Sequence, residues 1–154
     1  MSLLKIHTIN SKLINWRKNK IDIVFTNGCF DLLHKGHINL LNKASKYGDI
    51  LIVGLNSDSS VKKLKGEQRP IENERIRSKN LLNLECVNYV IVFNSQTPQD
   101  LVRIIMPDVL VKGADYSVNN IVGAEEVLSN GGRVEIVPLV DGYSTSSIIK
   151  TQNR

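Results

Sequence analysis

Short apolar runs alternate with amphipathic stretches along most of the chain. The runs are rich in β-branched residues and are continuous rather than alternating: IDIVFT (21–26), DILIVGLNSD (49–58), YVIVF (89–93), DVLVKG (108–113) and RVEIVPL (133–139). A strand that is buried on both faces of a sheet has this pattern. The sequence therefore predicts five central strands.

The stretches between these runs have helical spacing and helix-start signals. They are GHINLLNKASKYG (36–48), SDSSVKKLK (57–65), ENERIRSKNLLNLE (72–85), TPQDLVRIIM (97–106), NNIVGAEEVLSNGG (119–132) and STSSIIK (144–150). Ser57 or Asp58, Thr97 and Ser144 are the expected N-caps, and Pro98 suits a first helical position. The helix over 72–85 is expected to bury Ile76, Leu81 and Leu84.

Strands that alternate with helices are typical of an α/β fold. Right-handed crossovers then give a single Rossmann-like, doubly wound, parallel five-stranded sheet with helices on both faces. We expect one domain over 1–154, in which 1–20 form a helical lead-in. Ligands of such folds bind beyond the carboxyl ends of the strands.

Composition and charge narrow the classes of partner. The chain has 154 residues, a formal net charge of +5 and a pI of about 9.3. This balance suits either nucleic acid or a polyphosphate pocket. Aromatic residues make up only 5%, and no helix-turn-helix, RNA-binding aromatic pair or zinc finger is recognisable. We therefore expect no nucleic-acid partner.

The sequence also predicts a cytoplasmic protein. No apolar run approaches the length of a membrane span, so no membrane partner is expected. The N-terminal segment MSLLKIHTINSKL is too polar for a secretory signal. The two cysteines, Cys29 and Cys86, lie far apart in sequence and are expected to be free thiols.

The most informative stretch is FTNGCFDLLHKGH (25–37), which follows the first predicted strand and carries two of the three histidines. It is neither a GxGxxG nor a GxxxxGK[ST] loop. Gly28 permits a tight turn, and a helix that begins near His37 points free N–H groups at the same space. A zinc site needs further ligands, and Cys29 is the only soft ligand nearby. Helix capping and phosphate binding by His34 and His37 both stay open.

The HKGH segment matches the HxGH signature and resembles the nucleotidylyltransferase superfamily, which includes cytidylyltransferases and the pantetheine-phosphate and nicotinamide-nucleotide adenylyltransferases. Three further segments follow in order: LIVGLNSDSSVKKLKGEQRP (51–70), PDVLVKGADY (107–116) and DGYSTSSII (141–149). Together they resemble the adenylyltransferase domain of ADP-heptose synthesis, which some bacteria fuse to a kinase. The resemblance runs over about 21–150. The kinase part is absent, so a stand-alone form is expected.

The resemblance implies the reaction. ATP and D-glycero-β-D-manno-heptose 1-phosphate would give ADP-heptose and pyrophosphate, for lipopolysaccharide or another heptose glycan. It also implies Mg²⁺ bound with ATP, and a homodimer. The alternative is a cytidylyltransferase that uses CTP and glycerol 3-phosphate. Cytidylyltransferases carry an R-T-E-G-I-S-T-T segment, whereas Leu139 stands at the place of its arginine here. This departure favours the heptose branch.

The resemblance further implies a role for individual residues. The expected catalytic residues are His34, His37, Lys65 and Arg77, with Lys63 and Arg75 as alternatives to the last two. The expected nucleotide-binding residues are Asn27, Gly28, Cys29, Phe30, Gly36, Gly113, Asp115, Gly142, Ser144 and Thr145. The expected substrate-binding residues are Asp31, Asn56, Lys63 and Lys112. No residue is expected to bind a metal directly, because Mg²⁺ would be held mainly by substrate oxygens.

Overall fold

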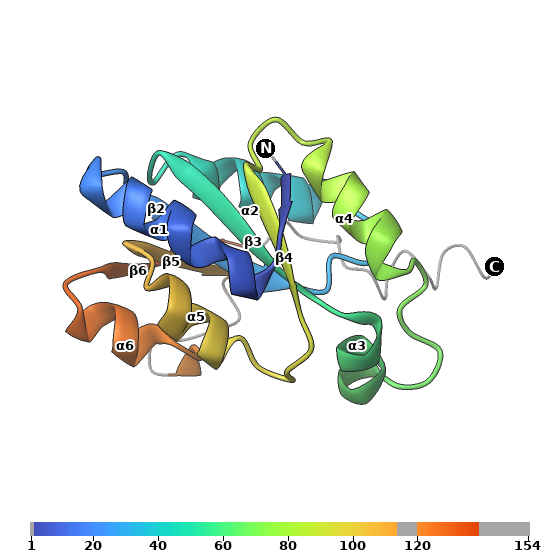
Figure 1. The fold of residues 1–154 in the computed structure, drawn as a ribbon. Helices are drawn as coiled ribbons and strands as arrows, with labels where there is room; N and C mark the ends of the chain where they lie inside the picture. The colour runs from blue at the N-terminus through green and yellow to red at the C-terminus, as the bar shows by residue number, and fades with distance from the viewer. Residues whose placement is uncertain (1, 114–119, 139–154) are drawn as a thin grey trace.

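All the strands in the described part of the chain lie in one parallel sheet (Figure 1). The computed structural model describes residues 2–113 and 120–138. The strands are β1 (Ser2–Leu4), β2 (Ile23–Gly28), β3 (Ile50–Asn56), β4 (Tyr89–Phe93), β5 (Val109–Gly113) and β6 (Arg133–Val137), in the order β1-β4-β3-β2-β5-β6. The five predicted strands are confirmed, and a sixth, β1, joins them.

The N-terminal segment is part of the sheet, so the prediction of a helical lead-in over 1–20 was wrong for its first residues. β1 pairs with β4, with Ser2 opposite Tyr89. A short 3-10 helix, η1 (Ile6–Thr8), and then α1 (Ile9–Lys18) follow. The strand has only three residues and Leu3 is half exposed, so it carries too short a pattern to be recognised.

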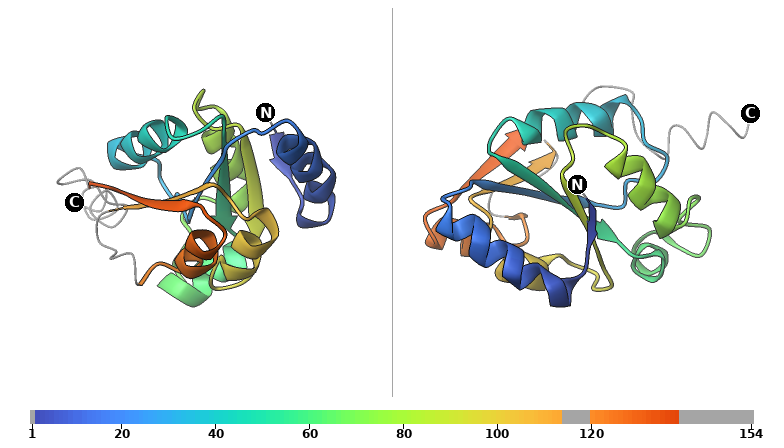
Figure 2. Two further views of the ribbon diagram at one scale, coloured as in Figure 1. Left: turned by 90° about the vertical axis from the view of Figure 1, so that its left-hand side faces the viewer. Right: turned by 45° about the horizontal axis from the view of Figure 1, so that its top comes forward.

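Helices cover both faces of the sheet (Figure 2), which confirms the doubly wound architecture. One face packs against α1, α5 (Gln99–Ile105) and α6 (Ala124–Ser129). The other face packs against α2 (Lys35–Ser45) and α4 (Glu74–Leu82). The remaining helix, α3 (Asp58–Lys65), lies past the end of β3 (Figure 1). Apolar layers on both sides therefore hold the strand ends in fixed positions.

Two predicted helix starts differ from the structure. Pro98, not Thr97, is the N-cap of α5, and no side chain caps that helix. The helix predicted over 119–132 is much shorter, because Gly123 adopts a φ of +89° and α6 begins only after it. In contrast, Ser57 caps α3 as expected, since its hydroxyl accepts a hydrogen bond from the Ser60 amide at 3.2 Å.

The phase of α4 was also predicted wrongly in part. Leu81 is fully buried as expected, but Ile76 is 44% exposed. Arg77 takes the inward position instead and is completely buried. A periodicity argument does not place a charged residue in a core, because burial of an unpaired charge is costly. The partners that make this burial possible belong to other elements and are described below.

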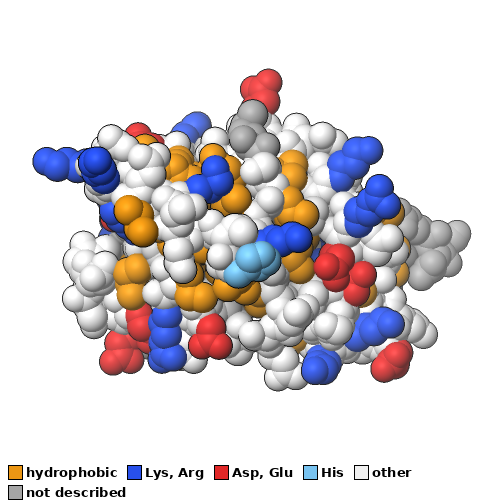
Figure 3. All heavy atoms as spheres, in the orientation of Figure 1, with side chains coloured by type: hydrophobic (Ala, Val, Ile, Leu, Met, Phe, Trp, Pro, Cys, Tyr) orange, Lys and Arg blue, Asp and Glu red, His pale blue; other side chains and the backbone are white. Residues whose placement is uncertain are grey.

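The surface gives no sign of a concentrated basic patch on the face shown in Figure 3, where Lys and Arg side chains are scattered among acidic and apolar ones. Among the described residues, none of the helices is long and apolar enough to cross a bilayer. The helix predicted over 144–150 lies outside the described residues, and the cytoplasmic location and the homodimer stay predictions.

Candidate active site

A cavity of about 500 Å³ opens where the order of the strands reverses. β2 lies between β3 and β5, so its carboxyl end and that of β5 border the point at which the chain changes direction across the sheet. Ligands of doubly wound folds bind at such a switch point. Nine of the predicted site residues line this cavity: Asn27, Gly28, Cys29, Phe30, His37, Asn56, Lys65, Lys112 and Gly113.

The loop after β2 turns through two residues in the left-handed region. Phe30 has a φ of +47° and Leu32 a φ of +54°. Gly28 was expected to make the tight turn, but it closes β2 instead. A Cβ at this position would meet the Phe30 ring at 3.0 Å, so a larger residue would require the ring to shift by a few tenths of an ångström.

His34 and His37 hold the start of α2. His34 is the N-cap, and its Nδ1 accepts a hydrogen bond from the Gly36 amide at 3.1 Å. The Nδ1 of His37 accepts from the His34 amide at 3.3 Å. The two rings stack with centroids 3.8 Å apart. A neutral imidazole whose Nδ1 accepts carries its proton on Nε2, so each ring is a donor through that atom.

Burial keeps both rings uncharged near neutral pH. It lowers the pKa of His37 to about 4, with a smaller effect from the nearby His34 and Lys65. Burial also lowers the pKa of His34. Of the two, His37 lines the cavity. The pair therefore offers neutral N–H donors, and positive charge must come from elsewhere.

Two lysines supply that charge. Lys65 is the last residue of α3, and Lys112 lies near the end of β5. Burial lowers the pKa of Lys112 to about 8, and its Nζ donates to the Asn27 carbonyl at 3.4 Å. Lys63 is exposed and does not line the cavity, so the structure favours Lys65 of the two alternatives. The described lining residues include no carboxylate.

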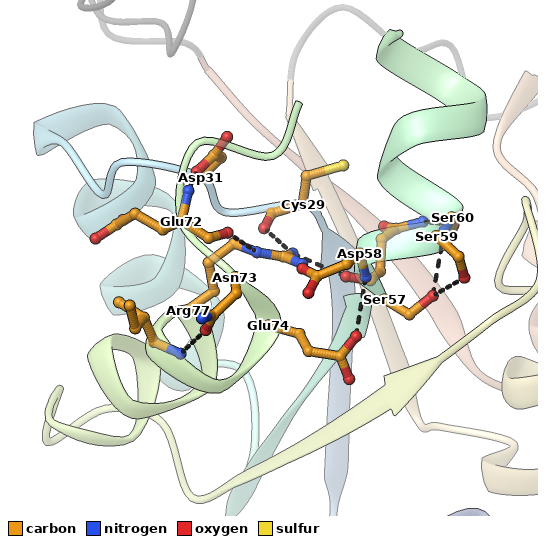
Figure 4. A network of polar contacts seen from close by, with 12 residues as sticks. Cys29, Asp31, Ser57, Asp58, Ser59, Ser60, Glu72, Asn73, Glu74 and Arg77 are labelled. Carbon is orange, nitrogen blue, oxygen red and sulfur yellow. Dashed lines mark hydrogen bonds and ion pairs between the residues drawn. The ribbon is translucent and has the colours of Figure 1, made fainter. Parts of the chain in front are cut away.

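Arg77 is bonded to the protein through all three of its nitrogen atoms (Figure 4). Its Nη1 donates to the carbonyls of Cys29 and Asn56, both at 2.8 Å. Its Nε donates to the Glu72 carbonyl at 2.9 Å, and its Nη2 pairs with Asp58 at 2.7 Å. Arg77 was expected to be a catalytic residue, but each of its nitrogen atoms is already bonded to the protein. It is a positioning residue that holds the loop after β2 against the end of β3.

Asp31 also holds loops together rather than facing a substrate. Its side chain is fully buried and accepts from the amides of Ile71 at 2.7 Å and Glu72 at 2.9 Å. In turn, the Glu72 side chain accepts a hydrogen bond from the Leu32 amide at 3.2 Å. The prediction that Asp31 binds substrate is therefore contradicted. The carboxylate instead fixes the segment that joins α3 to α4.

The remaining predicted residues divide into three groups. Gly36 lies in the first turn of α2 and does not line the cavity. Asn27 does line it, and its Oδ1 is buried without a hydrogen bond within the described ranges, which leaves an acceptor for a ligand hydroxyl. Four lie outside the described residues: Asp115, Gly142, Ser144 and Thr145.

Sequence reasoning missed one wall of the cavity. This wall comes from two segments, 96–98 after β4 and 120–122 before α6. The first could have been found from its place beyond the carboxyl end of a predicted strand. The second carries no motif. Among the described ranges, no three His, Cys, Asp or Glu side chains gather in a way that could hold a metal ion.

Curated relatives share about half of their matched residues with this chain. A bifunctional protein HldE from Koribacter versatilis (strain Ellin345) is 53% identical over 135 residues, which cover 88% of this chain and 28% of the relative. Another bifunctional protein HldE, from Geobacter metallireducens, is 55% identical over 127 residues, or 82% of this chain and 26% of the relative. The chain thus spans about a quarter of the length of these relatives.

Solved structures share the fold. A lipopolysaccharide core biosynthesis protein from Thermoplasma volcanium GSS1 matches 80% of this chain and 99% of its own, with a TM-score of 0.63 and 28% identity. A pantoate-beta-alanine ligase from Francisella tularensis matches 98% of this chain and 73% of its own, with a TM-score of 0.68 at 16% identity, and so shows the fold alone. The cytidylyltransferase-like family profile matches residues 25–151. The chain therefore belongs to the cytidylyltransferase-like family.

Proposed function

We propose that this chain is an adenylyltransferase that joins ATP to D-glycero-β-D-manno-heptose 1-phosphate, giving ADP-heptose and pyrophosphate for lipopolysaccharide or another heptose glycan. One observation carries the proposal. The cavity at the strand-order switch is lined by Lys65, Lys112 and His37, and its described lining contains no carboxylate. A site with donors and cations but no anion suits two phosphorylated substrates.

The chemistry fits these groups. The attacking group is a phosphate oxygen that is already ionised at neutral pH, so no general base is needed. The enzyme must align two polyanions and stabilise the charge that grows on the α-phosphoryl and leaving pyrophosphate oxygens. His34 and His37 donate through neutral N–H groups, and the start of α2 adds the positive end of an eleven-residue helix. Lys65 and Lys112 are the cationic side chains of the site.

Several observations support the heptose substrate and the adenine nucleotide. The four ordered segments resemble the domain of ADP-heptose synthesis, and the relatives reported above carry the name HldE. The structural neighbour from Thermoplasma volcanium GSS1 is a lipopolysaccharide core biosynthesis protein. The uncharged lining residues of 96–98 and 120–122 offer a place for a nucleoside.

We propose that Mg²⁺ enters with ATP. Mg²⁺ prefers oxygen ligands, and carboxylates are the usual protein donors. The described lining residues offer none, so the chain does not provide a cage for this ion there. The stabilisation of charge on the α-phosphoryl and pyrophosphate oxygens is therefore assigned to the donors and cations of the chain itself.

Pyrophosphate release with paired substrates tests the proposal. ATP with the heptose phosphate should react, whereas CTP with glycerol 3-phosphate should react poorly. A clear preference for the second pair would favour the cytidylyltransferase alternative over this proposal.

A further inference from the structure

Arg69 is held rigidly beside the loop that follows β2. Its side chain is only 12% exposed, and its Nε pairs with Asp31 at 3.1 Å. Asp31 is itself fixed, because it accepts from the Ile71 and Glu72 amides. The guanidinium therefore cannot swing out to solvent without the loss of a buried ion pair.

The same guanidinium has a donor that the protein does not use. Within the described part of the chain, Nη2 of Arg69 is buried and has no hydrogen-bond acceptor. A buried N–H group without an acceptor loses its hydration and gains nothing in return. Arg77 is different, since each of its nitrogen atoms is bonded to a protein oxygen. Only Arg69 of the two has a donor to offer a ligand.

Arg69 does not line the cavity itself, but its partner Asp31 directly follows Cys29 and Phe30, which do. The positive charges of Lys65, Arg77 and Arg69 all act on the Cys29 thiol, where they oppose the rise in its pKa that burial causes. Cys29 and Lys65 both line the cavity. The charge of Arg69 therefore adds to the positive field at a residue that lines the cavity.

We propose that Arg69 is a substrate-binding residue that donates its Nη2 to a phosphate oxygen. A phosphate oxygen would provide the Arg69 guanidinium with both a hydrogen-bond acceptor and a negative charge. The inference rests on the proposed function, because the two ligands considered are its substrates: the phosphates of ATP and the phosphate of the sugar.

Equilibrium titration of the full chain tests this role. Isothermal calorimetry would measure the dissociation constants of ATP, of the heptose 1-phosphate and of adenosine, with wild type, Arg69→Gln and Arg69→Lys. Arg133→Gln is the matched control, because Arg133 also pairs through its Nε with a carboxylate, Glu135, at 3.2 Å, but at the exposed first position of β6, at the amino end of that strand. Thermal melts of each variant show whether it is folded.

We expect Arg69→Gln to raise the dissociation constant of one or both phosphorylated ligands by about ten- to a hundredfold, as for loss of a charged hydrogen bond. Adenosine, which has no phosphate, should bind as in wild type, and Arg133→Gln should change nothing. If only the affinity for ATP falls, Arg69 binds the nucleotide phosphates. If only the affinity for the sugar phosphate falls, Arg69 binds the phosphate of the sugar. Arg69→Lys should also weaken binding, since it lacks the planar second donor.

Three results would overturn the inference. These are unchanged affinities in a folded Arg69 variant, equal weakening of adenosine and ATP, and a wild-type chain that binds neither phosphorylated ligand. If Arg69→Gln does not fold, the same outcomes apply to Arg69→Lys. A wild-type chain that binds both ligands but releases no pyrophosphate would refute the proposed function and leave the role of Arg69 standing.

Discussion

The backbone amide of His34 donates to Nδ1 of His37 at 3.3 Å, and the two rings stack face to face with centroids 3.8 Å apart. The amide of Gly36 donates in turn to Nδ1 of His34. Capping and phosphate binding are thus compatible uses of one pair, since the cap uses Nδ1 of each ring, whereas a phosphate would be met through Nε2. The capping role is confirmed, and the phosphate role stays a proposal.

His34→Asn separates the two roles. Asparagine is among the best N-cap residues, so α2 should keep its start and the melting temperature should change by only a few degrees. The Nε2 donor is lost, however, and kcat should fall by about a hundredfold or more, as for loss of a donor to a developing charge. The matched control is His7→Asn in η1, which should leave kcat unchanged. A folded His34→Asn variant with wild-type kcat would refute the catalytic role.

The low pKa of His37 predicts a loss of stability in acid. The pKa is about 4 in the folded chain against 6.5 for an ordinary histidine. Between these values the unfolded chain binds more protons, so the free energy of unfolding falls as the pH drops from 6.5 to 4. The loss attributable to His37 is at most about 3 kcal/mol.

Urea unfolding at several pH values measures this effect. His37→Asn removes the titrating group and should reduce the difference in stability between pH 7 and pH 4.5. An equally steep pH dependence in that variant would show that other groups cause it.

Arg77 should matter for folding more than for contact with substrate. Arg77→Ala leaves the carbonyls of Cys29, Asn56 and Glu72 without their donor inside the protein. Removal of one partner from a buried charged network typically costs about 3–5 kcal/mol. Urea unfolding should show a loss of this order. Arg75→Ala, an exposed position of the same helix, is the control and should stay within about 0.5 kcal/mol of wild type.

A stable Arg77→Ala chain with greatly reduced kcat would contradict this assignment. It would return Arg77 to the catalytic role that the sequence resemblance first implied.

Much of the fold follows from the sequence because the central strands are long apolar runs between well-marked turns. β1 could not be predicted from the sequence, since three residues at a sheet edge carry too little pattern and depend on pairing with β4. The burial of Arg77 does not follow either. It requires carbonyls from the ends of two strands and from a loop, and these meet only in the folded chain.

The candidate site was predicted unevenly for the same reason. Residues in short local motifs, such as His37 and Lys65, do line the cavity. Asp31 belongs to the same motif as the histidines, yet it bonds to amides some forty positions away in the chain. Sequence order shows that such a residue lies near the site but not which way its side chain points. Arg69 went unnoticed because its unused donor is visible only once its neighbours are placed.

The most direct test of the central claim is the initial rate of pyrophosphate release by the purified chain, with the nucleotide product identified by mass spectrometry. ATP and D-glycero-β-D-manno-heptose 1-phosphate should give pyrophosphate and ADP-heptose in equal amounts, at a rate well above that of CTP with glycerol 3-phosphate. No turnover of the first pair, or a faster reaction of the second, would contradict the account.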